Sequence, residues 1–446
     1  MSTIPAPPRA PQPGPVGPAP ATAGPSDGYG YDVQRVDPQG PGRLAEPRGQ
    51  ERRPRRVWVQ RLYWILSLLG LAATGAAVWF FVIRPLGLGT SLVAFTSALV
   101  PVTIVLTAVW WVDRYTPQPR ITLVYAFVWG AAGSVALTFV IGGVFTELAL
   151  PEAEAGSATE SFLGAAVQAP LVEESMKALG LAALLIWGRR FLSGPIDGVV
   201  YAVLIAAGFA FTENILYFGR SFHEAQAAGT VDVFWQTFLL RGLLSPFAHA
   251  SFTALCGLGL GIAAERRSLM LYFGLGLGGL SLGMSLHALW NGSAFFLEPD
   301  PEHPLAGFLR YYLTVQVPIF LLLVAIVLFL RLREKRILRR QLSEYGRAGW
   351  FSPAEVEVLI SMRGRARAER WAARHGAVAR MAMHDLILAS VELGMERHGV
   401  LQGRPTERTR RRERELLERI TVDRRQVSAL ERPVVRGAGT SAAVPV

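Results

Sequence analysis

The sequence is poor in cysteine and in charged residues. Its 446 residues include one cysteine, Cys256, which excludes an intramolecular disulfide framework and a metal site built from several cysteines. Charged residues make up 18% of the chain, whereas hydrophobic residues make up 51%. So low a charged fraction argues against an ordinary soluble protein and predicts a membrane protein.

Lysine is almost absent as well. Only Lys177 and Lys335 occur, so arginine supplies nearly all of the positive charge behind the net charge of +11. Such a charge would ordinarily suggest a nucleic-acid partner, but here the arginines gather in the tails and between apolar segments. That distribution follows the positive-inside rule of membrane proteins. We therefore expect a lipid bilayer as a partner and no nucleic acid.

Eight apolar stretches each approach the roughly 20 helical residues that cross a bilayer. They are residues 62–83, 86–111, 121–145, 161–187, 196–218, 236–263, 268–296 and 311–330. Residues 1–56, rich in Pro, Gly, Ala and Arg, cannot bury enough apolar surface to fold, and we predict a disordered cytoplasmic arm without a signal peptide. The fold class expected for residues 57–332 is an all-α, polytopic transmembrane helix bundle.

The charges between the stretches predict the topology. Arginines occupy the even-numbered gaps and acidic residues the odd-numbered gaps, which predicts a multi-pass protein of the plasma membrane with both termini in the cytoplasm. The cytoplasmic arginines are Arg114, Arg120, Arg189, Arg190, Arg266 and Arg267, and the outer acidic residues include Glu147, Glu160, Glu224 and Asp232.

After the eighth stretch the sequence becomes polar and rich in arginine. The run from Ser352 to Glu355 is typical of a helix start, and apolar residues follow at helical spacing as far as Leu393. We predict a small, basic, helical cytosolic region over residues 333–435, beside anionic lipid. A disordered tail is expected over residues 436–446.

Charged and polar side chains interrupt four consecutive apolar stretches. Inserting a charged side chain at the middle of a membrane helix costs about 2.5–3.5 kcal/mol, so each such residue needs a partner or a function. Helical spacing places Glu173 on the same face as Lys177, and His287 on the same face as Asn291. In the predicted topology the groups lie near the midplane or in the outer half, where one water-accessible cavity could hold them. The full set is Glu173, Glu174 and Lys177, then Glu213, then His249, then His287 and Asn291.

Other features of these stretches have simpler explanations. Arg241 is expected to reach the membrane surface or to pair with Glu224 or Asp232, and Asn214 can serve as an interhelical hydrogen-bond donor. The glycines from Gly274 to Gly283 favour close helix packing and do not form a phosphate-binding loop, because no strand precedes them.

Two carboxylates and two imidazoles can activate a water molecule. A glutamate can act as a general base, or a metal can lower the pKa of a bound water, and two histidines with one glutamate suit catalytic zinc. Peptide hydrolysis also needs oxyanion stabilisation and a proton for the leaving amine, which suit Asn291 and a protonated histidine. Alternative functions are a proton-coupled transporter, disfavoured by the lack of duplicated halves, and a non-catalytic membrane scaffold.

Four motifs follow one another on successive predicted helices: Glu173-Glu174-x-x-Lys177, Phe209-x-x-x-Glu213-Asn214, His249 and His287-x-x-x-Asn291. In this order they resemble those of the PrsW family of intramembrane proteases, over roughly residues 90–300. The family is related to the CAAX proteases and the bacteriocin-immunity membrane proteins. Glu213 stands where CAAX proteases carry histidine, which favours PrsW.

The resemblance implies a proteolytic site and a substrate class. Single-pass membrane proteins such as anti-sigma factors would be cut on the extracytoplasmic side during stress signalling. Either Glu173 or Glu174 would activate water; we predict Glu173 as the base, with Glu174 and Lys177 as its orienting partners. The predicted metal or oxyanion set is Glu213, His249 and His287 with Asn291. Zinc and a metal-free glutamate mechanism both stay open.

Overall fold

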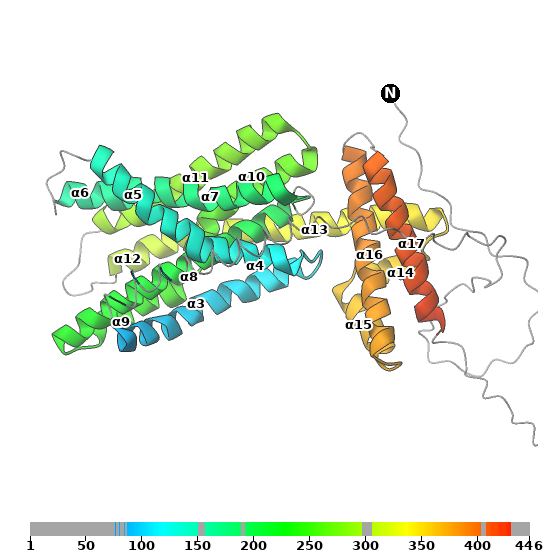
Figure 1. Ribbon diagram of the computed structural model, residues 1–446, viewed down its shortest axis with the longest axis horizontal. Helices are drawn as coiled ribbons and strands as arrows, with labels where there is room; N and C mark the ends of the chain where they lie inside the picture. The colour runs from blue at the N-terminus through cyan, green and yellow to red at the C-terminus, as the bar shows by residue number, and fades with distance from the viewer. Residues whose placement is uncertain are drawn as a thin grey trace, which may run out of the picture. The chain divides into compact units, whose positions relative to one another are not determined.

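The computed structural model describes residues 87–149, 157–188, 192–296, 306–402 and 407–429, together with residues 76, 80 and 84. Every regular element within these ranges is helical, which confirms the all-α fold class (Figure 1). The predicted arm over 1–56, most of the stretch 62–83 and the tail over 436–446 lie outside the described residues. The chain divides into two compact units, a membrane unit, Pro54–Arg333, and a second unit whose described residues begin at Glu334.

The membrane unit consists of long helices interrupted by π-helical turns. In chain order these are α3 (Leu88–Asp113), α4 (Arg120–Val128), η2 (Trp129–Ser134), α5 (Val135–Ala149), α6 (Ala158–Leu163), η3 (Gly164–Gln168), α7 (Ala169–Gly188), α8 (Pro195–Ala228), α9 (Asp232–Thr237), η4 (Phe238–Leu244), α10 (Ala248–Arg266), α11 (Leu269–Phe296), α12 (Ala306–Tyr311), η5 (Tyr312–Gln316) and α13 (Val317–Arg347), the last of which continues into the second unit.

Six helical stretches of the described chain are long and apolar enough to cross a membrane. They are Leu88–Asp113, Arg120–Glu147, Pro195–Ala228, Asp232–Arg266, Leu269–Phe296 and Ala306–Arg347. They overlap the second, third, fifth, sixth, seventh and eighth predicted segments. The fourth predicted segment is also helical, as α6, η3 and α7, but its three charged residues set it apart from these stretches in composition.

Helix α8 lies at the centre of the membrane unit and packs against α3, α4, α7 and α10. Its start is capped by Asp197, whose carboxylate accepts hydrogen bonds from the backbone N–H groups of Ser193 and Gly194. Tyr201 and Ile205, both fully buried, lie in the core that α8 shares with its neighbours. Because α8 touches so many helices, its rotation controls where its polar side chains point.

Glycines allow α8, α10 and α11 to approach one another closely. A Cβ atom on Gly257 of α10 would lie 2.2 Å from the carbonyl oxygen of Gly198 on α8, so only glycine fits this crossing. On the other side of α10, a Cβ on Gly279 of α11 would lie 2.3 Å from the carbonyl oxygen of Leu255. The close packing predicted for the glycine-rich run is therefore confirmed, and it brings the polar faces of the three helices together.

The second unit is a small helical domain with a core of its own. It contains the end of α13 with α14 (Pro353–Leu359), α15 (Met362–Ala373), α16 (Ala377–Gln402) and α17 (Glu407–Ala429), and α16 packs against α14, α15 and α17. Leu338, Leu393 and Leu416 are fully buried in it. The predicted helix start is confirmed, because Ser352 and Glu355 form a reciprocal capping box at α14.

Candidate active site

Six of the seven predicted site residues lie in one buried cluster where α7, α8, α10 and α11 meet. Helix α7 contributes three of them and each other helix contributes one: Glu173, Glu174, Lys177, Glu213, His249 and His287. Lys177 is 0% exposed, Glu174 and His287 are 1% exposed, and Glu173 and His249 are 8% exposed. Burying ionisable groups is costly, so the contacts that offset this cost define the site.

Lys177 is the hub of the cluster. Its Nζ lies 2.8 Å from Oε1 of Glu174, 3.3 Å from Oε2 of Glu173 and 3.2 Å from Nδ1 of His249. The ammonium group also lies 3.9 Å from the centre of the Phe209 ring, a cation–π contact. The pairing with Glu173 follows the i,i+4 spacing expected from the sequence, whereas the contact with His249 links α7 to α10.

The two adjacent glutamates have different surroundings. Both oxygens of Glu174 are engaged, since Oε1 accepts from Lys177 and from His287, and Oε2 accepts from Thr253 Oγ1 at 2.8 Å. Glu173 accepts a hydrogen bond only at Oε2, and its Oε1 has no hydrogen-bond partner among the residues that the structure describes. Glu173 therefore keeps a free carboxylate oxygen, while Glu174 serves as an anchor for its neighbours.

The contacts of His287 assign its tautomer. Its Nδ1 lies 3.2 Å from Oε1 of Glu174, and because a carboxylate only accepts, Nδ1–H is the donor. In the neutral ring the lone pair is then on Nε2, which lies 4.0 Å from Oε2 of Glu173. Stacking on Phe252, with ring centres 4.9 Å apart, holds the ring in this orientation.

His249 has a partner at each ring nitrogen. Lys177 can only donate, so Nδ1 of His249 accepts at 3.2 Å, and Nε2–H donates to Oε2 of Glu213 at 2.7 Å. The imidazole therefore connects the carboxylates of α7, through Lys177, with the carboxylate of α8.

Arg241 pairs with the cluster, contrary to the partners expected for it. Its Nη2 lies 2.5 Å from Oε2 of Glu213 and its Nε donates to Oδ1 of Asn214 at 3.1 Å, while the guanidinium lies 3.8 Å from the centre of the Tyr217 ring. The expected pairing with Glu224 or Asp232 is wrong. The sequence did contain a signal for the pairing of Arg241 with Glu213, because both residues lie near the predicted outer ends of their segments. No sequence pattern indicated the hydrogen bond of Thr253.

Asn291, the seventh predicted site residue, makes no hydrogen bond to the cluster's carboxylates or imidazoles among the described residues. It lies one turn beyond His287 on α11, and its Nδ2 donates to the carbonyl oxygen of Ala165 at 2.8 Å. Ala165 belongs to the π-helical turn η3, in which backbone carbonyls depart from the regular α-helical pattern. In this arrangement Asn291 joins α11 to the segment that leads into α7.

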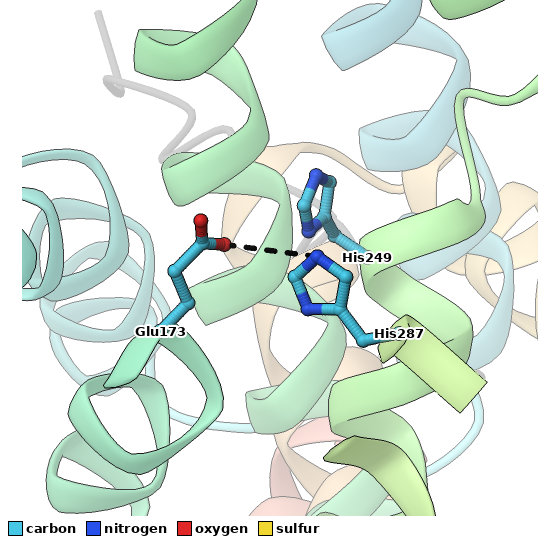
Figure 2. A group of neighbouring side chains, drawn as sticks. All are labelled: Glu173, His249 and His287. Atoms are coloured by element: carbon cyan, nitrogen blue, oxygen red, sulfur yellow. Dashed lines mark ion pairs between the residues drawn. The ribbon is translucent and has the colours of Figure 1, made fainter. Parts of the chain in front are cut away.

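Glu173, His249 and His287 form a group suited to a metal ion (Figure 2). One donor atom from each residue lies within 4.8 Å of the others. Two histidines and one carboxylate are a donor set of catalytic zinc sites, and the hydrogen bond from His287 to Glu174 is the outer-shell contact usual for a zinc-binding histidine. The carboxylate of this group is Glu173, whereas the metal set predicted from the sequence had Glu213 beside the same two histidines.

Residues 118–323 match the model of the PrsW family of intramembrane metalloproteases, and the match contains all of the cluster. Over these residues the membrane region is similar to the PrsW family. Two curated relatives are named Protease PrsW. The protein of Clostridioides difficile (strain 630) is 32% identical over 167 residues, which are 36% of this chain and 63% of the relative.

The second relative, from Geobacillus kaustophilus (strain HTA426), is 31% identical over 145 residues, which are 32% of this chain and 55% of that protein. The chain thus covers less than two thirds of the length of either PrsW relative. No solved structure matches the chain. The family match ends at residue 323, so it does not extend to the second unit.

Proposed function

We propose that the chain is an intramembrane protease that hydrolyses a peptide bond of a membrane-anchored protein with water activated at Glu173. The observation that carries this proposal is that Oε1 of Glu173 is free, while Oε2 of the same carboxylate lies 4.0 Å from Nε2 of His287. Figure 2 shows one Glu173 oxygen directed at His287 and the other turned away. An oxygen without a partner can accept a proton from water, whereas both oxygens of Glu174 are already engaged.

The charge balance of the cluster leaves room for added positive charge, either a proton or a metal ion. With neutral imidazoles, its three carboxylates and two permanent cations leave one net negative charge, which is costly within a membrane. The five groups are Glu173, Glu174, Glu213, Lys177 and Arg241. Zinc, held by Glu173, His249 and His287, would polarise the scissile carbonyl and lower the pKa of a bound water.

The side chains have distinct tasks in the proposed reaction. Glu173 takes a proton from water as the water oxygen bonds to the carbonyl carbon, and returns it to the amine as the carbon–nitrogen bond breaks. Glu174 holds His287 in place, and Lys177 holds Glu174. Asn291 donates a hydrogen bond to the oxyanion. To do so, its amide gives up the hydrogen bond to the carbonyl oxygen of Ala165 and turns to the substrate.

The proposed substrates are single-pass membrane proteins, such as anti-sigma factors, cut on the extracytoplasmic side as the family resemblance implies. Two observations support this class. The cluster is built into helices that are apolar enough to cross a membrane, which suits a substrate within the bilayer, and the loop charges predict that Glu213 and Arg241 lie toward the outer face. In this proposal both termini are cytoplasmic and the protein lies in the plasma membrane.

The test is cleavage of a single-pass, anti-sigma-like substrate by the full-length protein in nanodiscs. We expect Glu173→Gln and His287→Ala each to lower the cleavage rate by at least about 100-fold, because the proton acceptor or a ligand of the site is lost. Glu147→Gln is the matched control, since Glu147 is exposed on α5 and outside the cluster, and it should cleave at the wild-type rate.

A zinc chelator separates the two mechanisms. Loss of activity with chelator, restored by zinc, supports the metal-bound site; activity that survives exhaustive chelation supports glutamate-activated water without a metal. If folded wild-type protein leaves a panel of single-pass substrates intact, the protease proposal fails. Proton uptake into vesicles would then test the transporter alternative.

A further inference from the structure

The second unit exposes a row of arginines on one face of α15. Arg363, Arg367, Arg370 and Arg374 follow the spacing i, i+4, i+7 and i+11, which places them along one side of a helix, and all four are exposed. No ion pair joins any of them to an acidic residue in the described part of the unit.

Elsewhere in this unit, several arginines are used to hold helices together. Arg397 pairs with Glu344, Arg412 with Glu392, and Arg424 with Glu355. These ion pairs connect different helices and so contribute to the fold. The α15 row has no such task, which leaves its charge available for a partner outside the unit.

Exposed apolar side chains lie directly beyond the arginine row. The chain turns at Gly376, which has a φ of 108°. Near the start of α16, Val378 is 71% exposed and Met381 is 60% exposed. Arg380 is exposed between them. The only acidic residue from 362 to 381 is Glu369, and it pairs with His384 at 2.9 Å. We name residues 362–381 the α15–α16 corner.

We propose that the α15–α16 corner docks on an anionic lipid surface, with its arginines on phosphate groups and with Val378 and Met381 in the headgroup region. The arginines alone would suit any polyanion. Exposed aliphatic side chains beside them gain from insertion into a bilayer and gain little on a nucleic-acid backbone. The unit also follows directly on the membrane unit at Arg333, so the covalent connection keeps a bilayer surface within reach.

The test places an environment-sensitive fluorophore at Val378→Cys in the full-length protein, with Cys256 replaced by Ala. The labelled protein is reconstituted into nanodiscs of phosphatidylcholine with or without phosphatidylglycerol. We expect a blue-shifted emission and quenching by brominated lipid only when phosphatidylglycerol is present. Raising the salt concentration should reverse the shift, because the attraction is electrostatic.

Matched triple variants show whether the arginine row is responsible. Each arginine near an anionic surface strengthens binding about fivefold, so replacing Arg367, Arg370 and Arg374 with Gln should weaken docking roughly 100-fold and abolish the emission shift. The control removes the same charge from exposed positions on α17, by replacing Arg408, Arg414 and Arg425 with Gln, and should leave the shift in place.

Two results would overturn the proposal. One is equal emission in neutral and anionic nanodiscs. The other is a shift caused by an added RNA or DNA oligonucleotide but not by phosphatidylglycerol, which would make the corner a nucleic-acid surface. Neither result bears on the proposed protease, because the readout does not involve cleavage.

Discussion

Lys177 and a metal ion would draw on the same donor atoms. In His249, Nδ1 faces Lys177 and Nε2 faces Glu213, so a metal bound to this imidazole must displace one of the two contacts. The ammonium is also within reach of Oε2 of Glu173 and would repel a divalent ion at close range. Lys177 therefore balances the carboxylates and would at the same time lower the affinity for a metal.

Replacing Lys177 with Met should reveal both effects. Without zinc, loss of the counter-charge leaves buried carboxylates unpaired, and we expect the free energy of unfolding to fall by about 3–5 kcal/mol. Added zinc should raise the thermal unfolding midpoint of this variant by more than that of the wild type, because His249 and Glu173 are released for the metal. Thermal unfolding in detergent, with and without zinc, measures both.

The other lysine supplies the matched control. Lys335 lies in the second unit, so Lys335→Met should respond to zinc as the wild type does. A zinc-induced shift of the same size in all three proteins would show that Lys177 does not compete with the metal.

At the scale of helices, the α8–α10 crossing controls the geometry of the site. Gly257→Ala would place a Cβ 2.2 Å from the backbone oxygen of Gly198, so the helices must separate. Overpacking of this kind costs about 1–3 kcal/mol, and it would also shift His249 on α10 relative to Glu213 on α8. We expect a lower unfolding midpoint and a large loss of cleavage rate.

A glycine in open space provides the comparison. Gly278 on α11 has nothing within 4 Å of a Cβ position, so Gly278→Ala should keep both the unfolding midpoint and the cleavage rate. If Gly257→Ala behaved in the same way, the crossing would not control the site.

At the scale of the whole molecule, the predicted topology has a direct test. Glu224 and His375 are both exposed, and the loop charges predict that they lie on opposite sides of the membrane. An impermeant maleimide applied to intact cells should label Glu224→Cys at once, but His375→Cys only after permeabilisation. The native Cys256 is 3% exposed and should contribute little background. The reverse labelling pattern would invert the topology and with it the proposed side of cleavage.

Local chemistry was readable in the sequence. Membrane helices follow from runs of apolar residues, and the Glu173–Lys177 pair follows from helical periodicity, because both depend only on neighbours along the chain. The order of the polar motifs on successive helices was enough to indicate the family. The depth of the site in the membrane stays a prediction, because it depends on residue counts and loop charges.

Contacts between helices depended on the tertiary structure. That Glu174 binds His287 while Glu173 keeps a free oxygen depends on the rotation of α7 against α10 and α11. The same applies to Arg241, which meets Glu213 and neither of its expected partners. Rotation and separation are decided by packing at sites such as the glycine crossing of α8 and α10, where atoms far apart in the sequence meet. The periodicity of residues within one helix carries no information about how neighbouring helices are rotated and spaced.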